Sequence, residues 1–248
     1  MKEVGPSTLP PTFEIKTEGV KMEISQTIKY RLGRDNKRYW ASDNISDYIA
    51  EGEKDILIDE LEEKFEEVLK SLIIDIENDP NSKDTARRLA KMYINELMRG
   101  RYDPHPEPTA FPNIGETAYT GMLVVRAELT SMCSHHHQTV KGVAYIGIIP
   151  SEKVIGLSKY IRIAQWCAER GTLQEELCND IARQVKKATE SDNVAVYIKA
   201  KHGCCENRGV RATDSTTQTT VLNGEFHNSD VKKEFFDNIQ IQELSNRS

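Results

Sequence analysis

Apolar residues recur every three or four positions in two stretches of the first half of the chain, with charged residues between them. The first stretch covers residues 55–75, and the second covers residues 84–99 after Asp79-Pro80. This spacing gathers the apolar side chains on one face, so each stretch is predicted to be an amphipathic helix. Residues 102–114 then carry four prolines, which favours a loop.

The pattern changes in the second half to short runs rich in β-branched and aromatic residues. It predicts strands at 122–125, 143–149, 193–200 and 213–221, and helices at 158–169, 172–188 and 229–238. This mixture indicates an α+β protein. We divide it into an N-terminal extension over 1–53, a helical part over 54–101 and a strand-containing domain over 102–248. The extension begins with Pro6, Pro10 and Pro11, and we expect its start to be mobile.

Composition narrows the class of protein. The chain has 248 residues and a formal net charge of -6, which argues against broad affinity for nucleic acid. No apolar run approaches the roughly 18 residues of a membrane helix, and the first residues lack the pattern of a signal peptide. Five cysteines, two of them adjacent, do not form a disulfide framework. We therefore expect a cytoplasmic protein with no membrane partner.

Four of the six histidines fall in two short segments that also carry cysteine. Cys133 and His136 lie in the first segment, and Cys204 lies in the second. Thiolate and imidazole together are ligands that Zn²⁺ prefers, and three protein ligands leave a position for water. The alternative is a buried thiol beside surface histidines. His135 and His202 flank the candidate ligands and are candidates for moving protons near neutral pH.

Two further segments combine a helix start with groups that bind anions or bases. Ser158 is placed where a helix N-cap belongs, and Lys159 and Arg162 share a helix face, which suits a phosphate; from spacing alone, an ordinary capped helix with a solvated basic face explains them better. Thr172 to Glu175 fits a capping box, but Gln174 and Glu175 also suit the polar edge of a ring. Three more cations are candidates for a polyphosphate site: Arg208, Arg88 and Lys91.

Taken together, these segments resemble GTP cyclohydrolase I of the zinc-dependent type, over about residues 56–238. The resemblance is carried by an ordered set of segments: Arg88-Leu89-Ala90-Lys91-Met92-Tyr93, Ser131-Met132-Cys133-Ser134-His135-His136, Val154-Ile155-Gly156-Leu157-Ser158-Lys159, Leu173-Gln174-Glu175, Asn193-Val194-Ala195-Val196, His202-Gly203-Cys204 and Arg208-Gly209-Val210-Arg211.

The resemblance implies a fold and an activity. The fold is the tunnelling fold, an α+β arrangement with a four-stranded antiparallel sheet, two helices on one face and added N-terminal helices. Residues 102–248 are then the catalytic domain. The implied assembly is a homodecamer of two pentamers with active sites at subunit interfaces. The implied reaction opens the imidazole ring of GTP, releases formate and yields 7,8-dihydroneopterin triphosphate.

The resemblance also implies roles for single residues. The cofactor Zn²⁺ is held by Cys133, His136 and Cys204, and His135 and His202 are the catalytic histidines. Ser158 helps to place the ribose oxygens. Guanine is bound by Gln174 and Glu175. The triphosphate is held by Lys159, Arg162 and Arg208, with Arg88 and Lys91 contributed by a neighbouring subunit.

Three residues near the implied ligands depart from the family pattern: Ser134 replaces a usual Glu, His137 replaces a usually apolar residue, and Cys205 is an extra thiol. Two alternatives therefore stay open. One is an enzyme of the same fold acting on a related purine or pterin, such as the NADPH-dependent nitrile reductase of queuosine synthesis. The other is a non-catalytic, zinc-stabilised oligomer that binds guanine nucleotides, with His137 or Cys205 as a fourth ligand.

Overall fold

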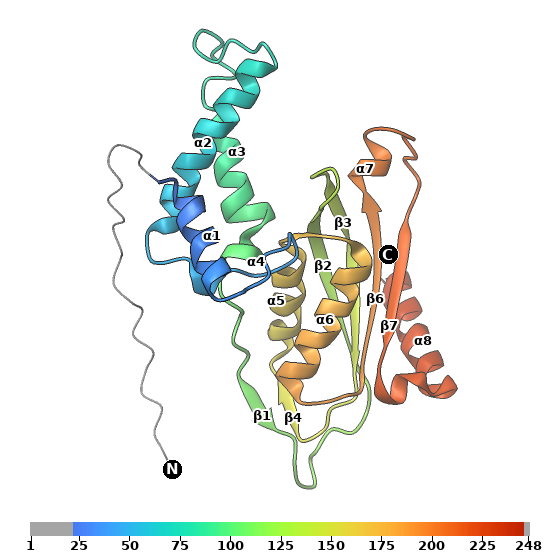
Figure 1. Cartoon of the computed structure of the whole chain (residues 1–248). Coiled ribbons are helices and arrows are strands. Elements are labelled where there is room, and N and C mark those ends of the chain that lie inside the picture. Colours follow the sequence, from blue (N-terminus) through green and yellow to red (C-terminus); the bar gives the residue numbers. More distant parts are fainter. Residues whose placement is uncertain (1–21, 246–248) are drawn as a thin grey trace, which may run out of the picture.

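A computed structural model describes residues 22–245 of the chain and divides them into a helical part and a sheet covered by helices (Figure 1). The helical part contains α1 (Ile24–Arg34), α2 (Glu53–Ser71), α3 (Thr85–Met92) and α4 (Arg99–Tyr102), with a short 3₁₀ turn at Ser46–Tyr48 and a π-helical turn at Tyr93–Leu97. No helix within these residues is both long enough and apolar enough to span a membrane.

The two amphipathic helices expected from the sequence form an antiparallel pair that projects beyond the sheet in Figure 1. α2 covers most of the predicted 55–75 stretch, and the predicted 84–99 helix is interrupted by the π-helical turn. Ile58 of α2 packs with Ala90 and Ile94 from the second stretch, and all three side chains are buried. The apolar spacing therefore predicted the helices but only part of the contact face, since Val68 and Leu72, which belong to the same apolar pattern, are 53% and 65% exposed.

The segment before α2, placed in the N-terminal extension, is folded onto the helical part from Ile24 onward. Ile28 and Leu32 of α1 form a small core with Ile45. Arg31, which belongs to a basic run, makes a two-pronged ion pair with Glu53 at 2.6 and 2.7 Å. Pairing of this kind fixes α1 against the start of α2. The prolines expected to make the start of the chain mobile lie outside the described residues.

A mixed sheet has the strand order β5-β2-β3-β6-β7, and its four long neighbours are antiparallel. The bounds are β2 (Leu123–Cys133), β3 (Thr139–Ile148), β5 (Gly171–Thr172), β6 (Val194–His202) and β7 (Thr217–Leu222). β5 adds two residues parallel to the end of β2. A separate two-stranded ladder joins β1 (Ala110–Pro112) to β4 (Lys153–Ile155). The α+β class is confirmed, and β5 and this small ladder were not expected.

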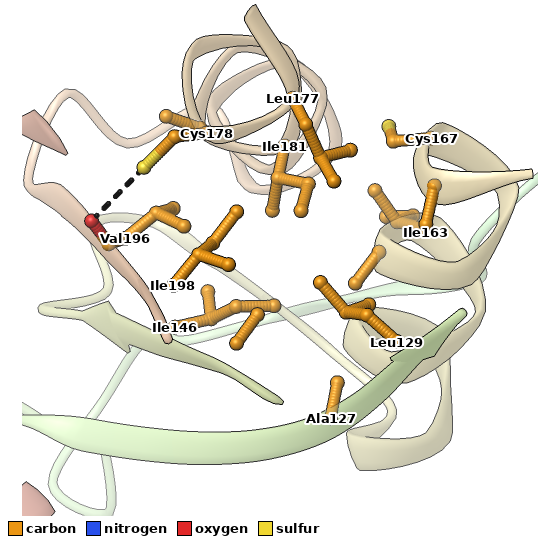
Figure 2. Packing of buried hydrophobic residues seen from close by; sticks show 14 of the residues in the cluster. Ala127, Leu129, Ile146, Ile163, Cys167, Leu177, Cys178, Ile181, Val196 and Ile198 are labelled. Carbon is orange, nitrogen blue, oxygen red and sulfur yellow. Dashed lines mark hydrogen bonds between the residues drawn. The ribbon is translucent and has the colours of Figure 1, made fainter. Parts of the chain in front are cut away.

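Helices cover both faces of the sheet. α5 (Leu157–Ala168) and α6 (Gln174–Thr189) pack on one face through a large apolar core, part of which is shown in Figure 2. In that view the Cys178 thiol donates to the Val196 carbonyl oxygen at 3.4 Å. The opposite face is covered by α8 (Ser229–Ser245), whose Phe235 packs with Tyr145 of β3. The last helix is therefore longer than the predicted 229–238.

Truncation of a buried side chain in the core between α6 and the sheet is expected to cause a large loss of stability. Ile181 is fully buried among the residues of Figure 2. We expect Ile181→Ala to lower the free energy of unfolding by about 2–5 kcal/mol, because it removes buried methyl groups and leaves a cavity. Ile241→Ala on α8, where the side chain is 62% exposed, is the matched control and should change it by less than about 0.5 kcal/mol. Denaturant titration of both variants measures the difference.

Candidate metal centre and active site

Three side chains at one end of the sheet bring ligand atoms together. The sulfur atoms of Cys133 and Cys204 and a ring nitrogen of His136 all lie within 4.8 Å of one another. Cys133 is the last residue of β2, and Cys204 lies in the short helix α7 (Gly203–Glu206) that follows β6. The sheet thus brings together residues that are up to 71 positions apart in the sequence.

A tight turn and one glycine make this approach possible. The amide of Cys133 donates to the Gln138 carbonyl oxygen, and the amide of His137 donates to the Cys133 carbonyl oxygen, each at 2.9 Å. This turn joins β2 to β3 and holds His136 above Cys133. β6 arrives beside it because Val140 pairs with His202. A side chain on Gly203 would come within 2.9 Å of the Thr139 carbonyl oxygen, so the chain needs glycine there.

The donor set fits a soft divalent cation. Burial and the neighbouring Cys133 thiol raise the pKa of Cys204 to about 11, so in the absence of a cation this thiol stays protonated at neutral pH. A bound divalent cation reverses that preference, since a coordinating thiol is deprotonated outright. Two sulfurs and one imidazole nitrogen also lie close enough together to share a single ion.

Both histidines predicted to move protons lie at this end of the sheet. His202 is half-buried at the end of β6, and its Nε2 lies 2.7 Å from Oε1 of Gln174. Burial lowers the pKa of His202, and the carboxylates of Glu175 and Glu206 oppose that effect. His135 is exposed on the turn after Cys133, with its ring edge-on to that of His136. The arrangement offers one fixed and one solvent-exposed imidazole beside the metal ligands.

Gln174 and Glu175 begin α6 at the same end, but the predicted capping box is wrong. Thr172 is extended because it pairs with Cys133 in β5, so Leu173 is the residue before the helix and no side chain caps it. The Gln174 side chain is buried, whereas that of Glu175 is exposed. Glu175 is therefore the neighbour that is open to a ligand.

Ser158, Lys159 and Arg162 lie at the beginning of α5, away from the metal ligands of the same chain. α5 follows β4 and rises about 18 Å over its 12 residues before the chain reaches β5 beside Cys133. Figure 1 shows this direction, with the start of α5 near β4 and its end near the end of β2 that carries Cys133. The predicted N-cap at Ser158 is also wrong, because the helix begins at Leu157 after Gly156.

The remaining predicted cations are exposed and lie in two separate parts of the fold. Arg208 follows α7, so it lies close in sequence to Cys204, and its side chain has no hydrogen bond or ion pair within residues 22–245. Arg88 and Lys91 lie on α3, where Arg88 forms an exposed ion pair with Asp84 at 3.4 Å. The structure thus brings Arg208 to the metal end and places the other two on the helical part.

Sequence reasoning missed two contacts that support the site. His137, considered above only as an alternative fourth ligand, has a left-handed φ of 51° and places Nδ1 3.3 Å from the Tyr93 hydroxyl. This contact joins the turn between β2 and β3 to the helical part. The second is the hydrogen bond between His202 and Gln174. No local sequence pattern predicts either contact, because each joins residues at least 28 positions apart.

Comparison with known proteins points to a single family. A family model described as GTP cyclohydrolase I matches residues 61–240. Relatives named GTP cyclohydrolase 1 include those of Flavobacterium johnsoniae, 35% identical over 74% of this chain and 82% of that protein, and of Yersinia enterocolitica, 38% identical over 71% and 80%. The relative from Buchnera aphidicola is 38% identical over 76% and 85%.

Among solved structures, an archaeosine synthase in its apo form matches 42% of this chain and 93% of its own length, with 17% identity and a TM-score of 0.35. That likeness is too weak to bear on the fold. The family model, by contrast, covers the second half of α2, all of α3, the sheet and the three candidate metal ligands. This chain belongs to the GTP cyclohydrolase I family.

Proposed function

We propose that the chain opens the imidazole ring of GTP by hydrolysis, releases formate and forms 7,8-dihydroneopterin triphosphate, at a centre built on Cys133, His136 and Cys204. The observation that carries this proposal is the convergence of these three ligand atoms within 4.8 Å, in a chain that belongs to the GTP cyclohydrolase I family. The tunnelling fold is part of the same proposal, supported by the antiparallel order of β2, β3, β6 and β7.

Zn²⁺ is the metal that this donor set favours. Two sulfurs and one imidazole match the His/Cys₂ type of catalytic zinc site, in which three protein ligands leave one position for water. The chemistry that Zn²⁺ supplies when bound is a water with a pKa of about 7, hence a nucleophile at neutral pH.

The residues around the candidate ligands have separate roles in the proposed reaction. His202 gives a proton to the nitrogen of the opening ring, and His135 carries protons between the site and solvent. Glu175 accepts two parallel N–H bonds from guanine. Arg208 holds part of the triphosphate from the same end of the sheet, and Lys159, Arg162, Arg88 and Lys91 supply further positive charge. Holding both ends of the substrate keeps the reacting carbon in place.

The site needs a second copy of the chain. The carbon that is hydrolysed is one bond from the nitrogen that carries the ribose, so a group that places the ribose must lie near the metal. Ser158 is separated from Cys133 of its own chain by most of the length of α5. A neighbouring subunit must therefore bring its own Ser158, Lys159 and Arg162 to this metal centre. This supports a homo-oligomer, and the decamer of two pentamers is our proposal for its size.

Glu175 provides a test of base recognition. We expect Glu175→Gln to raise KM for GTP about 10–100-fold with little change in kcat, because an amide cannot accept two N–H bonds on parallel oxygens and a hydrogen bond to a charged group contributes about 1.5–3 kcal/mol. The neighbouring Glu176 is also exposed, and Glu176→Gln should leave KM within about twofold of the parent. Steady-state kinetics on both variants decide; equal effects would contradict the assignment.

The function itself is tested with purified protein and GTP. Formate and a fluorescent pterin, measured after oxidation, should appear in equal amounts, disappear after chelation and return when Zn²⁺ is added. GTP consumption without formate would favour another enzyme of this fold. Tight binding of GTP without turnover, on protein with a full complement of zinc, would favour the non-catalytic oligomer. All five cysteines are free thiols, which supports our proposal that the protein acts in the cytoplasm. The assay is therefore run under reducing conditions.

A further inference from the structure

The side-chain amide of Gln174 is occupied inside the protein. The side chain is 5% exposed. Its Nε2 lies 3.2 Å from the Ile198 carbonyl oxygen, 3.1 Å from the Thr217 carbonyl oxygen and 3.2 Å from the Thr219 hydroxyl oxygen. These partners come from β6 and from β7. Two N–H groups facing three acceptors leave no donor for a ligand.

These partners fix which way the amide points. Carbonyl oxygens accept hydrogen bonds and cannot donate them, so the end of Gln174 that faces Ile198 and Thr217 must be the nitrogen. The oxygen then faces His202, with Oε1 at 2.7 Å from Nε2 of the ring. An amide oxygen only accepts, so the hydrogen in this contact belongs to His202 Nε2. The opposite ring nitrogen, Nδ1, is left to exchange protons.

We propose that Gln174 is a positioning residue for His202: it holds the imidazole ring and keeps its hydrogen on Nε2, so that Nδ1 is the nitrogen that takes up the proton released by the attacking water and then gives it to the ring nitrogen of the substrate. This gives Gln174 and Glu175 opposite tasks although they are adjacent. Glu175 is exposed and faces the ligand, whereas Gln174 points into the protein and acts through His202. The catalytic part of this inference rests on the proposed function; the tautomer does not.

Histidine tautomers matter for the rate because each ring nitrogen has one role. A neutral ring with hydrogen on Nε2 presents a lone pair only at Nδ1. An acceptor that holds a catalytic histidine in one tautomer contributes strongly to turnover in other enzymes, where its loss costs up to about 10⁴-fold. A neutral amide acceptor is weaker than a carboxylate, so a loss of about 100-fold is the expectation here, within the usual range for acid–base catalysis.

The tautomer is measured directly on the zinc-loaded protein without substrate. Protein labelled with ¹⁵N and ¹³C in histidine alone contains six labelled rings, and the His202 signals are those missing from His202→Asn. Solid-state NMR should show a protonated Nε2 and an unprotonated Nδ1 for this ring. A ring with hydrogen on Nδ1, or an even mixture of tautomers, would overturn the proposal whether or not the protein acts on GTP.

The role in turnover is measured with Gln174→Met, which keeps the length of the side chain and removes its hydrogen bonds. Zinc content is expected to stay at the parent value, kcat to fall about 100-fold and KM for GTP to stay within about threefold. Glu175→Gln is the matched variant, because it is expected to raise KM for GTP and to leave kcat nearly unchanged. A Gln174→Met protein with raised KM and unchanged kcat would show that Gln174 binds the base and would overturn the inference.

Failure of the Gln174→Met variant and failure of the proposed function can be told apart. Should Gln174→Met fail to fold or lose zinc, the NMR measurement on the unaltered chain decides the proposal alone. Should the parent protein release no formate from GTP, the proposed function is wrong, and the position of the hydrogen on His202 still decides whether Gln174 sets the tautomer.

Discussion

Cys204→Ala is expected to lose bound zinc and all measurable release of formate from GTP, and Cys133→Ala and His136→Ala should do the same. Each substitution removes one of three ligands that lie within 4.8 Å of one another. Two remaining ligands hold zinc far more weakly, and without zinc the site lacks a nucleophile at neutral pH. Zinc content is measured on dialysed protein and turnover with GTP, and both should fall together to the detection limit.

The adjacent thiol provides the control for this experiment. Cys205 is half-buried like Cys204 and lies next to it, but it does not belong to the group of three ligands. Cys205→Ala should therefore keep zinc and turnover close to the parent values. Full zinc content in any of the three ligand variants, or its loss in Cys205→Ala, would show that the ligands have been assigned wrongly.

Two inactive variants of this chain are expected to restore activity to each other when they assemble together. Cys133→Ala lacks the metal centre but keeps the cations at the start of α5, and the double variant Lys159→Ala/Arg162→Ala has the opposite defect. If, as we propose, a site takes its metal from one copy and these cations from another, about a quarter of the sites in a random 1:1 mixture contain both intact halves. Co-expression with two affinity tags and purification on both isolates the mixed assemblies.

The control pairs two defects in the same half of the site. Cys133→Ala co-expressed with His136→Ala should remain inactive, because every site then lacks a metal ligand whichever copies meet. Recovery to about a quarter in the first pair and none in the second supports a site shared between subunits. If the first pair stays as inactive as the second, Ser158, Lys159 and Arg162 do not reach the metal centre of a neighbouring copy.

Apolar periodicity predicted several of the longer elements, because burial of one face leaves a pattern within the element itself. The α2 and α3 helices and the strands β3 and β6 all appear where their patterns indicated. The helix starts were less accurate, because long-range pairing decided them: Thr172 pairs with Cys133 in β5, so it cannot cap α6. α1 was missed altogether, since its two buried residues, Ile28 and Leu32, are few among charged neighbours.

The candidate metal ligands were predicted from residue type and family resemblance rather than from periodicity. Residue type alone named Cys133, His136 and Cys204 as candidate zinc ligands, but a short Cys–His spacing is weak evidence and Cys204 is 71 residues beyond Cys133, so the assignment depended on the resemblance to a family. The sheet then brings the three together, because β2 and β6 end on either side of the start of β3. The role of Gln174 had no such guide, since its hydrogen bonds reach β6 and β7 and depend on the folded chain.

X-ray absorption at the zinc edge tests the central claim most directly. The account predicts one zinc per chain with two sulfur ligands at about 2.3 Å and two lighter ligands at about 2.0–2.1 Å, one of them an imidazole and the other water. Three sulfur ligands would place Cys205 on the metal, and two imidazoles without water would place His137 there. Either result would mean a closed, structural metal site and would contradict hydrolysis of GTP at this centre.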